Sequence, residues 1–249
     1  MTHRGACWHA GTALLLMLAT TAAAADQDLA AAPEVTVSGA ADSGVYLRID
    51  GGYGAGSRFS PDAVTTGPAT PVATGAAVGA SPAFDEGRFG HPAAISGGIG
   101  YRVNDLLRAD LTAEYFTGSI DGRIGGAGGS AVGIDFDAVG LMANAYADLG
   151  TVAGFTPYAG LGLGATRLDW SGMTTQGGLR SENKASDWRV TYALTAGVAY
   201  DVTERLTLDV NYRYSNIAGG TFLKNGLYEG KDDGLSRHEI RAGLRFNLW

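Results

Sequence analysis

The chain has 249 residues, of which 45% are hydrophobic and only 17% are charged, with 39 glycines and a formal net charge of −7. The acidic balance argues against a nucleic-acid partner. The glycine content argues against long helices, because each helical Gly costs about 1 kcal/mol. No apolar run reaches the roughly 18 residues of a membrane-spanning helix, which leaves a soluble β-protein or a membrane β-barrel.

The first 25 residues are typical of a secretory signal peptide. Arg4 supplies a positive charge, residues 13–19 form a short apolar core, and the alanines that follow fit an A-x-A cleavage site. We expect cleavage after residue 25 and a flexible leader over residues 26–43. Cys7 is the single cysteine and lies in the segment removed. The mature chain would therefore have no disulfide and no thiol chemistry.

Apolar and polar residues then alternate in eight stretches of the segment 44–249. A period of two is the pattern of a β-strand with one apolar and one polar face. We expect strands at residues 44–54, 93–103, 106–117, 137–149, 156–166, 189–202, 205–216 and 238–249.

The connections between these strands alternate between short and long. The first connection covers about residues 55–92, whereas the second is the tight turn around residues 104–105. Short turns at one end and long loops at the other are typical of an up-and-down transmembrane barrel. We therefore predict an all-β fold, an eight-stranded antiparallel barrel with short periplasmic turns and four long extracellular loops.

Aromatic residues of the apolar face gather near the two strand ends, with Leu, Val, Ile and Ala between them. This distribution is typical of a lipid-facing band between two aromatic girdles at headgroup level. The girdle on the long-loop side would comprise Tyr53, Tyr115, Tyr192, Tyr212 and Tyr214, and the girdle on the short-turn side Tyr101, Tyr200 and Phe246.

The opposite face carries six arginines and five acidic residues, together with several glycines. An eight-stranded barrel is just wide enough for its own side chains to fill it, and enclosed charges need partners. We expect a structural charge network in the barrel interior made of Arg48, Asp50, Arg102, Arg108, Asp110, Glu114, Asp209, Arg213, Glu239, Arg241 and Arg245.

No motif supports a catalytic, cofactor or metal site. The run GLGLGA at 160–165 lacks the helix that a phosphate-binding loop requires. Asp110 and Glu114 would lie about 13 Å apart along a strand, too far for a catalytic pair. His238 and Glu239 would point to opposite faces, which argues against a hydrolase triad. No spacing of histidines and carboxylates fits a metal ion. We predict no catalytic residue, no cofactor and no metal.

Four segments resemble the family of small outer-membrane β-barrels that includes porin-like surface antigens, opacity-type proteins and OmpA-like barrels. These segments are LMANAYADLG at 141–150, TPYAGLGLGA at 156–165, AGVAYDVTERLTLDVNYRYS at 196–215 and the terminal HEIRAGLRFNLW. The resemblance covers most of residues 93–249. It implies a Gram-negative outer-membrane protein that contributes to envelope integrity, surface antigenicity or adhesion through its loops.

The resemblance also implies partners. These are the lipid and lipopolysaccharide of the outer membrane, the barrel-assembly machinery through the C-terminal strand, and a host or cell-surface ligand at the loops. The chain departs from the family at its last residue. Trp249 lies one position out of phase with the apolar residues Phe246 and Leu248.

Three alternatives have different chemistry. A narrow channel for small solutes would need an open lumen. A secreted lipocalin-like binder would need the apolar face inside. A lipid A-modifying barrel enzyme would resemble the deacylases, which carry an H-x-S-N motif. Ser215 and Asn216 match that motif, but Arg213 stands at the histidine position. An arginine stays protonated and does not act as a general base.

Overall fold

The computed structural model describes residues 43–66, 84–89, 93–124, 130–175, 180–181, 185–225 and 228–248. The expected signal peptide, residues 26–42 of the expected leader and Trp249 lie outside this part of the chain. Where the chain is described it consists of strands and turns, and it contains no helix long and apolar enough to cross a membrane.

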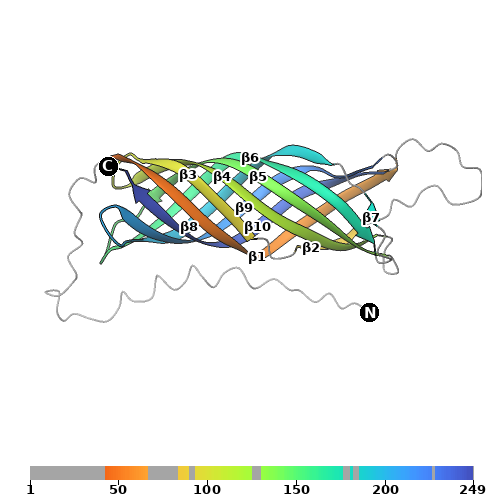
Figure 1. Cartoon of the computed structure of the whole chain (residues 1–249), viewed down its shortest axis with the longest axis horizontal. Coiled ribbons are helices and arrows are strands. Elements are labelled where there is room, and N and C mark those ends of the chain that lie inside the picture. The colour runs from red at the N-terminus through yellow and green to blue at the C-terminus, as the bar shows by residue number, and fades with distance from the viewer. Residues whose placement is uncertain are drawn as a thin grey trace, which may run out of the picture. The chain divides into compact units, whose positions relative to one another are not determined.

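The strands wind around one common axis and form a single barrel (Figure 1). Their bounds are β1 Gly44–Thr66, β2 Phe84–Phe89, β3 Ala93–Arg102, β4 Leu107–Ile124, β5 Ser130–Asp148, β6 Phe155–Thr175, β7 Arg180–Ser181, β8 Ser186–Asp201, β9 Leu206–Asn225 and β10 Tyr228–Asn247.

Pairing between the first and last strands closes the ring. β1 pairs antiparallel with β10 on one side and with β3 on the other, and β3, β4, β5, β6, β8, β9 and β10 follow in order. The short strands extend this ring, since β2 pairs with both neighbours of β3 and β7 pairs with β6. The predicted eight-stranded antiparallel barrel is therefore confirmed, and closure leaves no strand edge exposed along the paired length.

The three short turns lie at the same end as the C-terminus, at the left of Figure 1. Two of them are fixed by side chains, because Asn104 Oδ1 accepts hydrogen bonds from the backbone N of Leu106 and Leu107 at 2.9 and 2.7 Å, and Thr203 Oγ1 accepts from Leu206 N at 3.0 Å. Such contacts are the usual turn chemistry of Asn and Thr. The third turn uses Gly150, whose φ of 95° favours glycine.

The strands extend further toward the long-loop end than the alternation pattern predicted. β1, β5, β6, β9 and β10 contain 23, 19, 21, 20 and 20 residues, whereas a tilted strand crosses a membrane with about 9–11. Much of the sequence assigned to the long connections is hydrogen-bonded strand. The predicted strand ends were therefore wrong at this side, although every predicted strand exists.

Candidate functional site

The outer surface of the barrel is apolar over the half that ends in the short turns. Side chains such as Leu111, Leu141, Leu161 and Val210 are more than half exposed there. Such a continuous apolar surface requires a lipid environment. The structure places all eight girdle residues, seven tyrosines and Phe246, on this surface, with Tyr214 half-buried and the rest exposed.

The lumen behind this surface is filled with positive and negative side chains in equal number. Six arginines and six carboxylates are buried there, which leaves the enclosed set neutral. They are Arg48, Arg108, Arg213, Arg237, Arg241, Arg245, Asp50, Asp110, Asp148, Asp209, Glu114 and Glu239.

One cluster of four charges spans the lumen near the girdle on the long-loop side, which we call the upper girdle. Arg237 and Arg241, both on β10, each contact Glu114 and Glu239. The Arg237–Glu114 and Arg241–Glu239 distances are both 2.7 Å. Glu114 lies on β4, which is not a neighbour of β10 in the ring. The cluster therefore ties opposite walls of the barrel together and obstructs the lumen.

A second cluster lies closer to the short turns. Arg48 contacts Asp50 and Asp110 at 2.7 Å each, and its guanidinium donates to the Tyr146 hydroxyl at 2.9 Å. Asn144 donates to Asp110 at 2.8 Å. These residues come from β1, β4 and β5, so this cluster also crosses between strands that are not neighbours.

Tyrosines fill the remaining space at this end. The Arg108 guanidinium lies 4.3 and 4.4 Å from the ring centroids of Tyr146 and Tyr158, and its Nε contacts Asp148 at 3.0 Å. A Cβ at Gly160 would collide with the Tyr146 ring. The small residues of the strands thus make room for tyrosine rings, whereas the sequence analysis found no inward tyrosines.

Two of the expected lumen residues differ from the rest. Arg102 is only half-buried at the end of β3 and makes none of the ion pairs found among the described residues, so the expectation that it joins the network is wrong. Arg213 is buried, but its described hydrogen bonds go to Asn144 and Thr195 at 3.3 to 3.5 Å rather than to a carboxylate. Arg237 and Asp148 were missed, although each shares the parity of inward residues on its own strand.

Above the upper girdle the lumen changes from charged to apolar. The buried residues of this region pack in one cluster, in which the ring centroids of Phe136 and Trp170 lie 5.1 Å apart and those of Phe116 and Phe136 lie 6.0 Å apart. Trp170 on β6 also contacts Phe222 on β9 across β8. We call this cluster the apolar plug; it comprises Ala94, Phe116, Ile120, Ile134, Phe136, Ala138, Leu168, Trp170, Ala185, Ile217, Phe222 and Leu235.

The outer surface around the apolar plug is polar. Thr117, Asp135, Asp137, Arg167 and Ser171 point outward and are exposed. Both faces of the sheet therefore exchange polarity at the upper girdle, where the Tyr115 hydroxyl donates to Asp137 at 2.8 Å. An apolar interior with a polar exterior is the pattern of a sheet surrounded by water. The strand extensions consequently lie beyond the lipid.

A buried ion cluster accompanies the apolar plug. Arg189 contacts Asp187 at 2.9 Å and Asp232 at 2.7 Å, and its guanidinium lies 5.9 Å from the Trp170 ring centroid. Burial raises the pKa of the Asp232 carboxyl, while the Arg189 charge acts in the opposite direction. The cluster joins β8 to β10, which are separated by β9 in the ring.

The serine that matches the deacylase motif does not contact His238. Ser215 is 3% exposed and points into the lumen, whereas His238 lies on the outer surface, where its Nδ1 is 2.6 Å from the Tyr212 hydroxyl. Within the described residues, no group of His, Cys, Asp or Glu is arranged to hold a metal ion.

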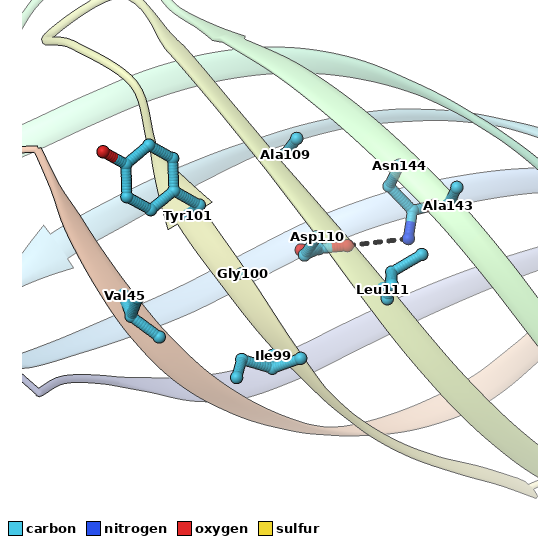
Figure 2. A pocket seen from close by; sticks show the side chains of 9 residues that line it. All are labelled: Val45, Ile99, Gly100, Tyr101, Ala109, Asp110, Leu111, Ala143 and Asn144. Atoms are coloured by element: carbon cyan, nitrogen blue, oxygen red, sulfur yellow. Dashed lines mark hydrogen bonds between the residues drawn. The ribbon is translucent and has the colours of Figure 1, made fainter.

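A shallow groove of about 380 Å³ lies on the lipid-facing wall rather than in the lumen (Figure 2). Apolar side chains of Val45, Ile99, Leu111 and Ala143 line it, and Asp110 and Asn144 bond to each other on the lumen side. Its surface is almost entirely apolar, so a hydrocarbon chain fits it better than a polar ligand.

Comparisons with known proteins agree with this geometry. The family model of the outer membrane protein beta-barrel domain matches residues 11–247. An uncharacterized protein of Brucella abortus is 35% identical over 189 residues, which are 61% of this chain and 66% of that protein. The match thus spans slightly less than two thirds of that relative.

Two further relatives are more distant. The outer membrane protein PagN of Salmonella typhimurium is 27% identical over 216 residues, which cover 79% of this chain and 84% of that protein. A protein of Rickettsia bellii named as a candidate adhesin is 27% identical over 169 residues, 61% of this chain and 73% of that protein. The family match covers nearly the whole chain, and the strands, girdles and closed ring are those of a transmembrane barrel. The chain therefore belongs to the outer membrane protein beta-barrel domain family and resides in the outer membrane.

Proposed function

We propose that the protein is a non-enzymatic surface protein that presents its extracellular loops on a packed extension of the barrel. Through these loops it serves as a surface antigen or adhesin, and its cross-braced wall contributes to envelope integrity. One observation carries the proposal: the strands continue past the upper girdle around the apolar plug.

The length of the extension supports this role. Residues 116–124 of β4 follow the girdle residue Tyr115, and at the usual strand rise and tilt they span about 20 Å. That height would carry the connections of the strands above the lipid headgroups. The Rickettsia bellii relative, named as a candidate adhesin, adds support from a related chain.

A channel function is the second candidate, and the lumen argues against it. The charge clusters join strands that are not neighbours in the ring, and the rings of the apolar plug fill the lumen above them, with Trp170 and Phe222 in contact across β8. Purified protein in planar bilayers should therefore show no large, stable conductance. Reproducible currents like those of a 16-stranded porin would support the channel instead.

A lipid A-modifying activity has less support. The hydroxyl of Ser215 is enclosed by the barrel wall, and Arg213 replaces the base. Lipid A from cells with and without the protein should carry the same acyl chains by mass spectrometry. Loss of an acyl chain that depends on Ser215 would contradict the non-enzymatic proposal.

Adhesion of intact cells tests the proposal. We would replace residues 67–83, between β1 and β2, by an equally long Gly-Ser sequence, and would replace the short turn 202–205 in the same way. Cells with the first variant should adhere less to epithelial cells, and cells with the second should adhere like the wild type. If cells lacking the protein adhere as well as wild-type cells, the adhesive role is wrong.

A further inference from the structure

The outer wall over β8, β9 and β10 carries a polar and aromatic patch at the level of the upper girdle. We call it the aromatic wall. Cross-strand pairing arranges its nine outward residues in three rows, from the loop side toward the membrane centre: Tyr192–Asn216–Ser236, Leu194–Tyr214–His238 and Ala196–Tyr212–Ile240.

The polarity of the aromatic wall changes from row to row. The lowest row presents alanine, isoleucine and a tyrosine ring, and the uppermost presents amide and hydroxyl groups. Asn216 donates to Ser236 Oγ at 3.0 Å, and the rings of Tyr214 and His238 lie 5.0 Å apart. Such a gradient matches an amphiphile with its chains below and its polar head above.

His238 is positioned by the girdle. Its Nδ1 lies 2.6 Å from the Tyr212 hydroxyl. When that hydroxyl donates to Nδ1, the proton of the neutral imidazole lies on Nε2. The half-buried side chain then offers an N–H donor on the outer surface, beside the Tyr214 ring.

The wall over β4, β5 and β6 provides a contrast at the same level. Its corresponding rows are Thr117–Asp137–Asp169, Tyr115–Val139–Arg167 and Ala113–Leu141–Ala165. Two carboxylates lie side by side in the uppermost row, whereas the nine residues of the aromatic wall include none. Arg167 is paired with Asp169 at 3.1 Å, which leaves the Asp137 carboxylate without a cation among the described residues of the β4–β6 wall. An anionic headgroup would therefore meet a net negative charge at that wall and no carboxylate at the aromatic wall.

We propose that the aromatic wall binds lipid A, the phosphorylated glucosamine glycolipid of the outer leaflet. Its acyl chains lie along Leu194, Ala196 and Ile240, and a sugar ring packs on the Tyr212 and Tyr214 rings. A phosphate accepts a hydrogen bond from His238 Nε2. The inference rests on the outer-membrane location and the wall geometry, and it does not depend on the adhesive role.

Native mass spectrometry of the purified full-length protein in phosphatidylcholine nanodiscs tests this proposal. Titration with diphosphoryl lipid A should show one saturable site. His238→Phe keeps an aromatic ring but removes the N–H donor, and it should weaken binding about tenfold or more, the change expected when a hydrogen bond to a charged group is lost. Tyr212→Phe retains the ring but releases His238 and should weaken binding less.

Tyr115→Phe is the matched control, because it removes the same hydroxyl from the other wall. It should leave the affinity for lipid A unchanged. Heat-dependent migration on gels verifies that each variant is folded, and the conservative Tyr212→Phe keeps the test available if His238→Phe does not fold. Equal weakening by Tyr115→Phe, equal affinity for phosphatidylglycerol, or no saturable lipid A site would each overturn the proposal.

Discussion

The two halves of the barrel solve the same packing problem with opposite chemistry. In the half between the girdles, apolar side chains face outward and a neutral set of charges fills the lumen. In the extension, carboxylates such as Asp135 face outward and rings such as Phe136 fill the lumen. The backbone pairing between β4 and β5 continues through the junction without a register shift. The surrounding solvent, rather than the backbone, thus decides which residue type occupies each face.

The difference teaches how each half resists opening. Between the girdles, the apolar surface gains nothing from folding against lipid tails, so the backbone pairing of the closed ring and cross-lumen contacts such as Glu114 with Arg237 hold the walls. In the extension, water surrounds the barrel, and burying each large side chain of the apolar plug contributes about 1.5–3 kcal/mol. Substitutions at the two levels should therefore have different consequences.

The largest effect is expected from Glu114→Leu. This change leaves Arg237 and Arg241 without one of their two carboxylates, and breaking a buried ion pair costs about 3–5 kcal/mol. Urea unfolding in lipid vesicles measures it. The same change at Glu204, exposed in a short turn, is the control. Similar stability of both variants would mean that water screens the lumen charges.

Phe136→Ala should destabilise the extension and leave the half between the girdles intact. Removing a buried aromatic side chain costs about 3 kcal/mol or more. Limited proteolysis of the protein in vesicles should cut β5 near residue 136 faster, while heat-dependent migration on gels persists. Phe155→Ala, at an exposed position, is the control. Loss of the whole barrel would show that the two halves fold as one unit.

Leu141→Arg and Asp135→Arg compare the two levels on one face of β5. Leu141 is 56% exposed on the lipid side, one outward position below the girdle row, where an added arginine should cost about 1–2 kcal/mol, between the values for the interface and for the membrane centre. Asp135 is exposed on the extension, and an arginine there should change the free energy of unfolding by less than about 0.5 kcal/mol. Equal effects would place the lipid boundary elsewhere.

Arg213→Leu should have the smallest effect of the lumen substitutions. Arg213 lacks a carboxylate within ion-pair distance among the described residues, and its bonds to Asn144 are 3.3 Å long. We expect a loss of about 1 kcal/mol, the net contribution of ordinary hydrogen bonds. Urea unfolding of the Arg213→Leu and Glu114→Leu variants under the same conditions measures the difference between their free energies of unfolding. A loss as large as that of Glu114→Leu would assign Arg213 a share in the charge cluster.

The sequence predicted the strands because alternation is a strong local signal, but it misplaced their upper ends. At Tyr115 and Phe116 the apolar residues of β4 change from odd to even positions. β5 runs in the opposite direction and changes from even to odd positions between Ala138 and Val139. A loss of phase is ordinarily the sign that a strand ends, which is why the predicted strands stop there. The change instead marks the passage from lipid to water, and its occurrence in neighbouring strands is a signal that sequence reasoning can use.

Which residues face the lumen could largely be predicted from the alternation of odd and even positions along each strand. Which of these residues contact one another could not. Arg237 lies one residue before the predicted start of the last strand, so the alternation did not assign it to the lumen. Tyr46 is also buried in the lumen, but it is uncharged and so was not expected in a charge network. Glu114 and Arg237 are 123 residues apart and lie on strands that are not neighbours. Their contact depends on the stagger of the closed ring, which no local pattern records.

Single cysteines along β5 test the exchange of polarity most directly. Cys7 is the only native cysteine, so each variant would carry one site after that residue is changed to serine. On intact cells, a membrane-impermeant maleimide should label cysteines at 135 and 137 and spare those at 136 and 138. A lipid-soluble reagent should reach a cysteine at 141 and spare one at 142. Labelling at 136 and 138, or protection at 135 and 137, would contradict the packed extension on which the account rests.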